Sequence, residues 1–206
     1  MAALSPLLIC ALCFGHGNRT SCRQRFAADI TRAAERFALP RAWICAVIEV
    51  ESGGHQRLDG VPIVSARGAM GLMQLMPKTF AAMARRYHLP ATPFAARENI
   101  LAGAGYLHRC YLRFGFPLLF SAYAAGPERV EKFIIHGEPL PRSARDYTLH
   151  ILHSLGAGRA VMVSFASAAA RDLFVTPSDG SRLFAGPPSG GRATPRARTG
   201  ASIYGQ

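Results

Sequence analysis

One carboxylate, Glu51, lies where a helical pattern requires an apolar side chain. Ile44, Val47, Ile48 and Glu51 are spaced i, i+3, i+4 and i+7, which places them on one face of a helix. If this face is buried, desolvation raises the pKa of Glu51, because the charged form loses more on leaving water than the neutral form does. Such an acid keeps its proton near neutral pH and can donate it to a leaving group. The spacing therefore predicts that Glu51 is a general acid.

The residues after Glu51 predict how it is presented. Ser52 is followed by Gly53 and Gly54, and glycine readily adopts the left-handed conformation that ends a helix. Gly68 and Gly71, farther on, permit close backbone approaches that a Cβ atom would forbid. We therefore expect Glu51 at the end of its helix, facing a cleft beside a glycine-punctuated loop.

Helical periodicity predicts the elements that hold this segment. Apolar residues recur at helical spacing over 26–37, 41–52, 97–114 and 142–155, and shorter helices are expected over 77–87 and 128–136. Residues 118–125 form an apolar segment. Trp43 is interpreted as a core anchor rather than as a sugar-binding platform. The pattern predicts an all-α domain over residues 23–157.

Several segments resemble the soluble lytic transglycosylase family, over roughly residues 26–155. They are Glu51-Ser52, then Ser65, then GAMGLMQLMP at 68–77, and much later AYAAGP at 122–127. Asn99, Ile100, Gly103, Tyr106 and Leu107 also match the family's N-I-x-x-G-x-x-Y-L pattern. The resemblance implies a lysozyme-like helical fold.

The resemblance also implies a reaction, namely cleavage of peptidoglycan between N-acetylmuramic acid and N-acetylglucosamine. Glu51 is expected to protonate the bridging oxygen and then to accept a proton from the C6 hydroxyl of the muramoyl residue. That hydroxyl closes a 1,6-anhydro ring, so no water is consumed, and neither a metal nor another cofactor is expected. The implied substrate-binding residues are Ser65 and Gln74, which hydrogen-bond the acid or the N-acetyl group, Met73 as an apolar wall, Tyr123 beside the acid, and Tyr147.

Most glycoside hydrolases use two carboxylates, and this sequence offers one good candidate. Asp59 is expected to be a solvated loop residue, and Glu98 to complement the dipole of its helix from the first turn. The N-acetyl group of the sugar can replace the second carboxylate by attacking its own anomeric carbon. A single catalytic glutamate is therefore sufficient for this chemistry.

The sequence departs from the family pattern at two places. Ala124 replaces an asparagine that lines the sugar cleft in the family, and Ser143 to Asp146 replace a stretch in which the family often has glutamate and threonine. Two substrate contacts are therefore in question. Two alternatives stay open, namely a lysozyme-type muramidase that hydrolyses the same bond and a non-catalytic peptidoglycan-binding scaffold protein.

The net charge of +12 indicates attraction to polyanions. Nucleic acid, anionic lipid and the acidic bacterial wall all fit, but the sequence shows no recognition helix, zinc-ligand spacing or interleaved basic and aromatic platform. We therefore expect the wall as partner and no nucleic acid. Of the five cysteines, Cys45 and Cys110 are expected to be buried thiols, with a disulfide between them left open.

The two ends of the chain differ from the middle. Residues 1–22 include a short apolar run, interpreted as a secretory leader and too short for an integral membrane span. The alternatives are a hydrophobic N-terminal helix and a start codon assigned too far into a longer leader. Residues 158–206 contain six Arg and two Asp with much Gly, Pro and Ser, which predicts a mostly disordered basic tail. The leader predicts a periplasmic protein. Similarity to small family members suggests an association with secretion or conjugation machinery.

Overall fold

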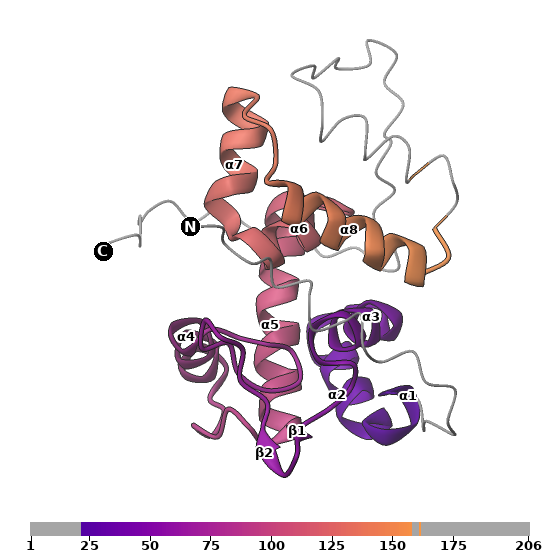
Figure 1. Cartoon of the computed structure of the whole chain (residues 1–206), viewed down its shortest axis with the longest axis vertical. Helices are drawn as coiled ribbons and strands as arrows, with labels where there is room; N and C mark the ends of the chain where they lie inside the picture. The colour runs from indigo at the N-terminus through magenta and orange to yellow at the C-terminus, as the bar shows by residue number, and fades with distance from the viewer. Residues whose placement is uncertain (1–21, 158–160, 162–206) are drawn as a thin grey trace, which may run out of the picture. The chain divides into compact units, whose positions relative to one another are not determined.

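The computed structural model describes residues 22–157 and residue 161. Apart from Cys22, the predicted leader over 1–22 lies outside these residues. The predicted basic tail over 158–206 also lies outside them, apart from Val161. Both stay predictions. The described part is mainly helical (Figure 1). Its helices are α1 (Cys22–Arg25), α2 (Ala27–Phe37), α3 (Arg41–Ser52), α4 (Pro77–Tyr87), α5 (Ala96–Phe114), α6 (Leu118–Ala125), α7 (Pro127–His136) and α8 (Arg142–Ser154).

Helix α5 is the central element of the fold. It is 19 residues long and packs against α2, α4 and α6 (Figure 1). A run of small buried residues over 102–105 lets its neighbours approach closely. A Cβ atom on Gly105 would lie 2.4 Å from the ring of Tyr87 on α4. Because α5 is covered on several sides, it can fix the positions of the elements that carry the site.

Helix α3 lies against α2 and α8 and carries the predicted acid. Ile44, Val47 and Ile48 are fully buried, so the apolar face predicted from their spacing is confirmed. Gly53 ends the helix with a left-handed φ of 59°, as the sequence predicted. Trp43 packs on the rings of Tyr111, Phe116 and Phe120 at centroid distances of 5.3–5.7 Å, so its core role is confirmed.

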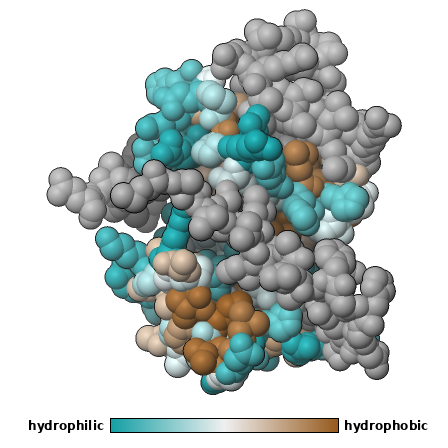
Figure 2. All heavy atoms as spheres, viewed as in Figure 1, coloured by the Kyte–Doolittle hydropathy of each residue, from teal (hydrophilic) through white to brown (hydrophobic). Residues whose placement is uncertain are grey.

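The segment between α3 and α4 contains a short β-hairpin that the sequence analysis did not predict. Strands β1 (Arg57–Leu58) and β2 (Val61–Pro62) pair in antiparallel register. Asp59 and Gly60 form the turn with φ values of 51° and 80°, a combination that aspartate followed by glycine favours. In the lower half of Figure 2, apolar surface gathers above this hairpin. The exposed apolar side chains of the hairpin and of the loops that follow are Leu58, Val61, Val64, Met76 and Phe94.

The predicted helices agree with the structure to within a few residues, and the all-α class is confirmed. The apolar segment over 118–125 is helix α6, with five of its side chains buried. Cys45 and Cys110 are both buried, and no disulfide joins them. No helix in the part of the chain that the structure describes is both long enough and apolar enough to cross a membrane.

Candidate active site

Glu51 lies in the last turn of α3 and is partly buried. The hydroxyl of Tyr147, on α8, donates a hydrogen bond to Glu51 Oε1 at 2.8 Å. The next residue, Ser52, donates to the carbonyl oxygen of Leu72 at 2.8 Å and thereby ties the end of α3 to the following loop. The acid is therefore held between a helix end, that loop and a tyrosine that is 96 residues away in sequence.

Two opposing effects set the acidity of Glu51. Burial raises the pKa, and the hydrogen bond from Tyr147 lowers it by a smaller amount, so the net pKa is about 7 rather than the ordinary 4.5. A group with this pKa is close to half protonated near neutral pH. It can donate a proton in one step of a reaction and take one back in the next.

Tyr123, on α6, is a second buried tyrosine that interacts with Glu51. Its hydroxyl donates to the carbonyl oxygen of Met73 at 2.7 Å, and its ring packs on Tyr106 at a centroid distance of 5.3 Å. Burial and, second to it, the charge of Glu51 raise the pKa of Tyr123 well above its ordinary value. The structure therefore places Tyr123 near Glu51, while the hydrogen bond to the acid comes from Tyr147.

The loop that carries Met73 is held by Asn99, a buried residue of α5. Its Oδ1 accepts a hydrogen bond from the backbone N–H of Met73 at 2.7 Å. Its Nδ2 donates to the carbonyl oxygens of Met70 at 3.0 Å and Pro93 at 2.7 Å. Asn99 matches a family pattern in the sequence, but no role was predicted for it. Its signal was an amide in the first turn of a helix, followed directly by the apolar residues Ile100 and Leu101.

Two glycines let this loop lie directly on α5. A Cβ atom on Gly71 would lie 2.4 Å from Asn99 Nδ2 and 2.8 Å from the carbonyl oxygen of Pro93. A Cβ atom on Gly103 would lie 2.4 Å from Met73 Sδ. Contacts this short do not occur between real side chains, so both positions require glycine for the observed packing.

The remaining predicted site residues lie on the same loop but in different environments. Gln74 adopts a left-handed φ of 45°, and its Nε2 donates to the carbonyl oxygen of Gly71 at 2.8 Å. A non-glycine residue in that conformation is strained, a feature that clusters at functional sites. The side chain of Met73 is fully buried, so it is the backbone carbonyl that reaches toward Tyr123. The hydroxyl of Ser65 accepts from the N–H of Ala69 at 3.0 Å, within its own turn.

The other carboxylates that the sequence analysis weighed lie elsewhere. Asp59 is exposed in the turn of the β-hairpin, and Glu98 occupies the first turn of α5, as expected for a dipole partner. The departures Ala124 and Ser143 are both exposed, on α6 and in the first turn of α8. Among residues 22–157, no three His, Cys, Asp or Glu side chains are grouped as a metal ion would require.

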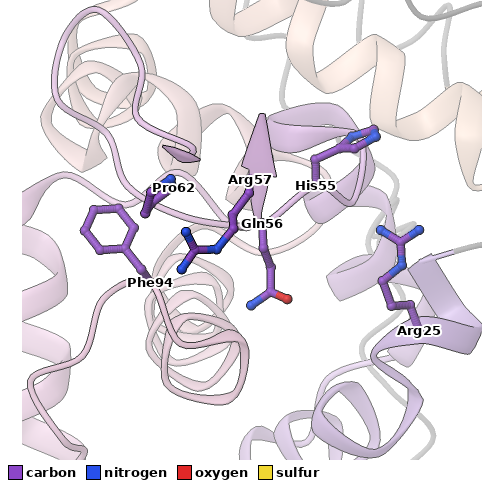
Figure 3. A pocket seen from close by; sticks show the side chains of 6 residues that line it. All are labelled: Arg25, His55, Gln56, Arg57, Pro62 and Phe94. Atoms are coloured by element: carbon purple, nitrogen blue, oxygen red, sulfur yellow. The ribbon is translucent and has the colours of Figure 1, made fainter. Parts of the chain in front are cut away.

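A cavity of about 290 Å³ opens beside the hairpin (Figure 3). In this view the side chains of Arg57, Pro62 and Phe94 gather on one side, and His55 and Arg25 lie on the other. Arg57 donates to the carbonyl oxygen of Gly60 at 2.7 Å, and Arg25 to that of Gly54 at 3.1 Å. None of the six site residues predicted from sequence lines this cavity.

Comparison with known proteins identifies the same segment. Residues 29–136 match the model of the transglycosylase SLT domain family. The soluble lytic murein transglycosylase of Escherichia coli is 31% identical over 103 residues, which are 47% of this chain and 15% of that protein. The chain therefore spans a small fraction of the length of this relative.

Solved structures share the fold. An inactive glutamate-to-glutamine mutant of the lytic transglycosylase Slt from Pseudomonas aeruginosa superposes with a TM-score of 0.55 and 28% identity, over 73% of this chain and 26% of that one. A complex of the 70 kDa soluble lytic transglycosylase with bulgecin A has a TM-score of 0.56 and 23% identity, over 68% of this chain and 26% of that one. The lysozyme-like fold predicted from the sequence is confirmed by these likenesses.

Proposed function

Since the chain belongs to the transglycosylase SLT domain family, we propose that it is a lytic transglycosylase that cleaves the glycan strands of peptidoglycan. The bond is the β-1,4 link between N-acetylmuramic acid and N-acetylglucosamine, and the product carries a 1,6-anhydro ring. The observation that carries this proposal is a partly buried carboxyl, Glu51, with a pKa of about 7 and a hydrogen bond from Tyr147.

In the first step Glu51 acts as the acid. Its proton moves to the bridging oxygen while the bond from that oxygen to C1 of the muramoyl residue breaks. The N-acetyl group of the same sugar stabilises the positive charge that develops at C1, in the role that a second carboxylate has in most glycosidases. This assignment fits the exposed position of Asp59 in the hairpin turn and the place of Glu98 in the first turn of α5.

In the second step Glu51 acts as the base. As a carboxylate it removes the proton from the C6 hydroxyl, and the C6 oxygen forms a new bond to C1. The proton returns to Glu51, so the acid is regenerated and no water is consumed. One bond to C1 breaks, one forms, and the net proton transfer runs from the C6 oxygen to the leaving oxygen. A pKa near 7 suits a group that must both give and take a proton at neutral pH.

Tyr147 is assigned the role of orienting the carboxyl, because its hydroxyl donates to one of the two oxygens and leaves the other for substrate. Tyr123 holds the loop carbonyl of Met73 in place beside the acid. Gln74 and Ser65 lie on the same loop and are proposed as contacts for the N-acetyl group. The fully buried side chain of Met73 can form the sugar-binding wall only if the loop shifts when substrate binds.

The Pseudomonas relative supports the assignment of the chemistry to a glutamate, since its glutamate-to-glutamine mutant is inactive. Peptidoglycan lies outside the cytoplasmic membrane, so the proposed substrate places the enzyme in an extracytoplasmic compartment. Local opening of the wall for a secretion or conjugation machine is the more specific role we propose from the resemblance. It would be supported if deletion of the coding sequence reduced transfer or secretion and Glu51→Gln failed to restore it.

The test of the reaction type is the mass of the products. Purified protein is incubated with peptidoglycan sacculi, and the released fragments are measured by mass spectrometry. The proposal predicts 1,6-anhydro ends, which are one water lighter than the reducing ends that a muramidase leaves. Reducing ends would identify a hydrolase instead. Saturable wall binding without any fragments would identify a scaffold protein, which is the outcome that the departures at Ala124 and Ser143 could produce.

A further inference from the structure

A second cavity, of about 340 Å³, opens between α2, α4 and α5. It is open to solvent, since Arg36, Arg86 and Leu112 in its lining are exposed. Its lining contains three arginines, a histidine, two aromatic rings and a leucine, with no carboxylate among them. These residues are Arg36 and Phe37 from α2, Arg86 and Tyr87 from α4, and His108, Arg109 and Leu112 from α5.

This basic cavity lies on the side of α5 that faces away from Glu51. Gly103 packs on Met73, in the loop beside Glu51, whereas Gly105 packs on Tyr87, which lines the basic cavity. Successive residues of an α-helix are rotated by about 100°, so these two positions point in nearly opposite directions. A ligand in the basic cavity therefore does not contact the proposed catalytic group.

Within the part of the chain that the structure describes, the arginines of the cavity form no ion pair with a carboxylate. The ion pairs found among residues 22–157 involve none of Arg36, Arg86 and Arg109. Arg36 is already oriented, since its Nη2 donates to the carbonyl oxygen of Tyr87 at 2.7 Å. Its guanidinium carbon also lies 5.6 Å from the centroid of Phe37 and 5.7 Å from that of Tyr87. Its other N–H groups remain for a ligand, because a guanidinium has five donors.

His108 and the rings complete the lining. His108 contributes a half-buried ring that forms a hydrogen bond with the backbone of Phe37. The His108 ring lies 6.1 Å from that of Phe37, and the guanidinium of Arg86 lies 5.9 Å from the centroid of Tyr87. Aromatic walls beside a group of cations fit a molecule with both an anionic group and an apolar or planar part.

We propose that this basic cavity binds the phosphate group of a phosphorylated small molecule, whose organic part contacts Tyr87 and the exposed Leu112. Guanidinium groups match phosphate oxygens in bidentate geometry. Three of them supply more positive charge than one carboxylate would balance, so a doubly charged phosphate monoester fits better than a carboxylic acid. The cavity of Figure 3 is a weaker anion site, since it has only two arginines and each already donates to a backbone carbonyl.

The test uses the full chain and three probes, namely phenyl phosphate, inorganic phosphate and benzoate, in isothermal titration calorimetry. Phenyl phosphate should bind saturably with one site per chain, inorganic phosphate more weakly, and benzoate most weakly. Arg86→Ala and Arg109→Ala should each reduce the affinity for phenyl phosphate about ten-fold or more, as expected for the loss of a charge-assisted hydrogen bond.

Two matched controls separate the cavity from general surface charge. Arg85→Ala removes an exposed arginine of α4 that does not line the cavity, and Arg57→Ala removes one from the cavity beside the hairpin. Both should leave the affinity for phenyl phosphate unchanged, and Arg86→Ala should leave cleavage of peptidoglycan unchanged.

Three results would overturn the proposal. They are an absence of saturable binding, equal losses in Arg85→Ala and Arg86→Ala, and binding of benzoate as tight as that of phenyl phosphate. None of them bears on the proposed transglycosylase activity, which depends on Glu51.

Discussion

A carboxyl group whose pKa is raised by folding makes the folded protein less stable at neutral pH than at low pH. Folding raises the pKa of Glu51 from 4.5 to about 7, so the folded state binds this proton more tightly than the unfolded state does. The free energy of unfolding therefore falls as the pH rises from about 4.5 to about 7 and is unaffected by this group below that window. At 1.36 kcal/mol per pKa unit, the full loss above pH 7 is about 3 kcal/mol.

Glu51→Gln should remove this pH dependence. Glutamine has nearly the same shape and stays neutral, so the variant should gain about 3 kcal/mol relative to the wild type between low pH and pH 8. Urea unfolding of both proteins over that pH range measures the difference. If the difference in stability between the two proteins did not change with pH, Glu51 would not have the raised pKa on which the mechanism depends.

Tyr147→Phe tests the hydrogen bond that lowers the pKa of Glu51. The hydrogen bond from Tyr147 lowers the pKa of Glu51, so its removal should raise that pKa above about 7. A hydrogen bond to a charged group contributes about 1.5–3 kcal/mol, which corresponds to roughly one to two pKa units. The pH at which kcat/KM decreases on the alkaline side of the profile should rise by that amount. Tyr123→Phe is the matched control, since that hydroxyl donates to Met73, and it should leave the position of the decrease unchanged.

At the scale of elements, the loop 68–77 is positioned mainly by its contacts with α5. Asn99 forms hydrogen bonds with Met73 and Met70, and Gly103 leaves space for the Met73 side chain. Ser52 joins the end of α3 to the same loop through Leu72. A change in any of these contacts should move the loop relative to Glu51 even though none of these side chains is proposed to take part in the chemistry.

Gly71 and Gly68 offer a matched pair of substitutions. Both adopt a left-handed φ, 72° and 84°, so alanine is strained at either position by about 1–2 kcal/mol. Only at Gly71 would the new Cβ atom also clash with Asn99 and with a backbone oxygen, since nothing lies within 4 Å at Gly68. Gly71→Ala should therefore destabilise the protein by roughly 1–3 kcal/mol more than Gly68→Ala, as measured by chemical denaturation. Equal effects would mean that the close packing on α5 is not rigid.

The sequence predicted α2, α3, α4, α5, α7 and α8 because each has a periodic apolar face and a recognisable end. It did not predict α1, which has four residues, and it predicted α6 only as an apolar segment, because α6 is apolar on every side. The boundaries of α3, for example, follow from Pro40 before it and Gly53 after it. The acid was also predictable, because Glu51 interrupts an apolar face. The hairpin was missed because its strands have only two residues each, too few for a period to be visible.

The partners of the acid were less predictable, because they depend on tertiary packing. The family pattern predicts Tyr123 beside the acid, but the hydroxyl of Tyr123 donates to the carbonyl oxygen of Met73. The packing of α8 against α3 decides that the hydroxyl that reaches Glu51 is that of Tyr147. The burial of the Met73 side chain against Gly103 likewise depends on a contact between residues that are 30 positions apart.

For the whole molecule, the net charge of +12 predicts how it meets its substrate. Attraction to the acidic wall should be screened by salt, because the Debye length falls from about 10 Å at 0.1 M to about 3 Å at 1 M. Glu51→Gln is expected to bind the wall without cleaving it, so its binding can be measured alone. Its sedimentation with sacculi should decrease as salt rises. Its affinity for uncharged chitin oligosaccharides, which lack the acidic groups, should stay constant. A wall affinity that salt did not change would contradict an electrostatic contribution.

The central claim is that one carboxyl group performs the chemistry. The most direct measurement compares Glu51→Gln with Glu49→Gln, an exposed glutamate of the same helix, for release of fragments from purified peptidoglycan. The mechanism predicts that Glu49→Gln cleaves at the wild-type rate, whereas Glu51→Gln folds and binds the wall but loses about 10²-fold or more of its activity. Cleavage by Glu51→Gln at a rate near that of the wild type would contradict the account.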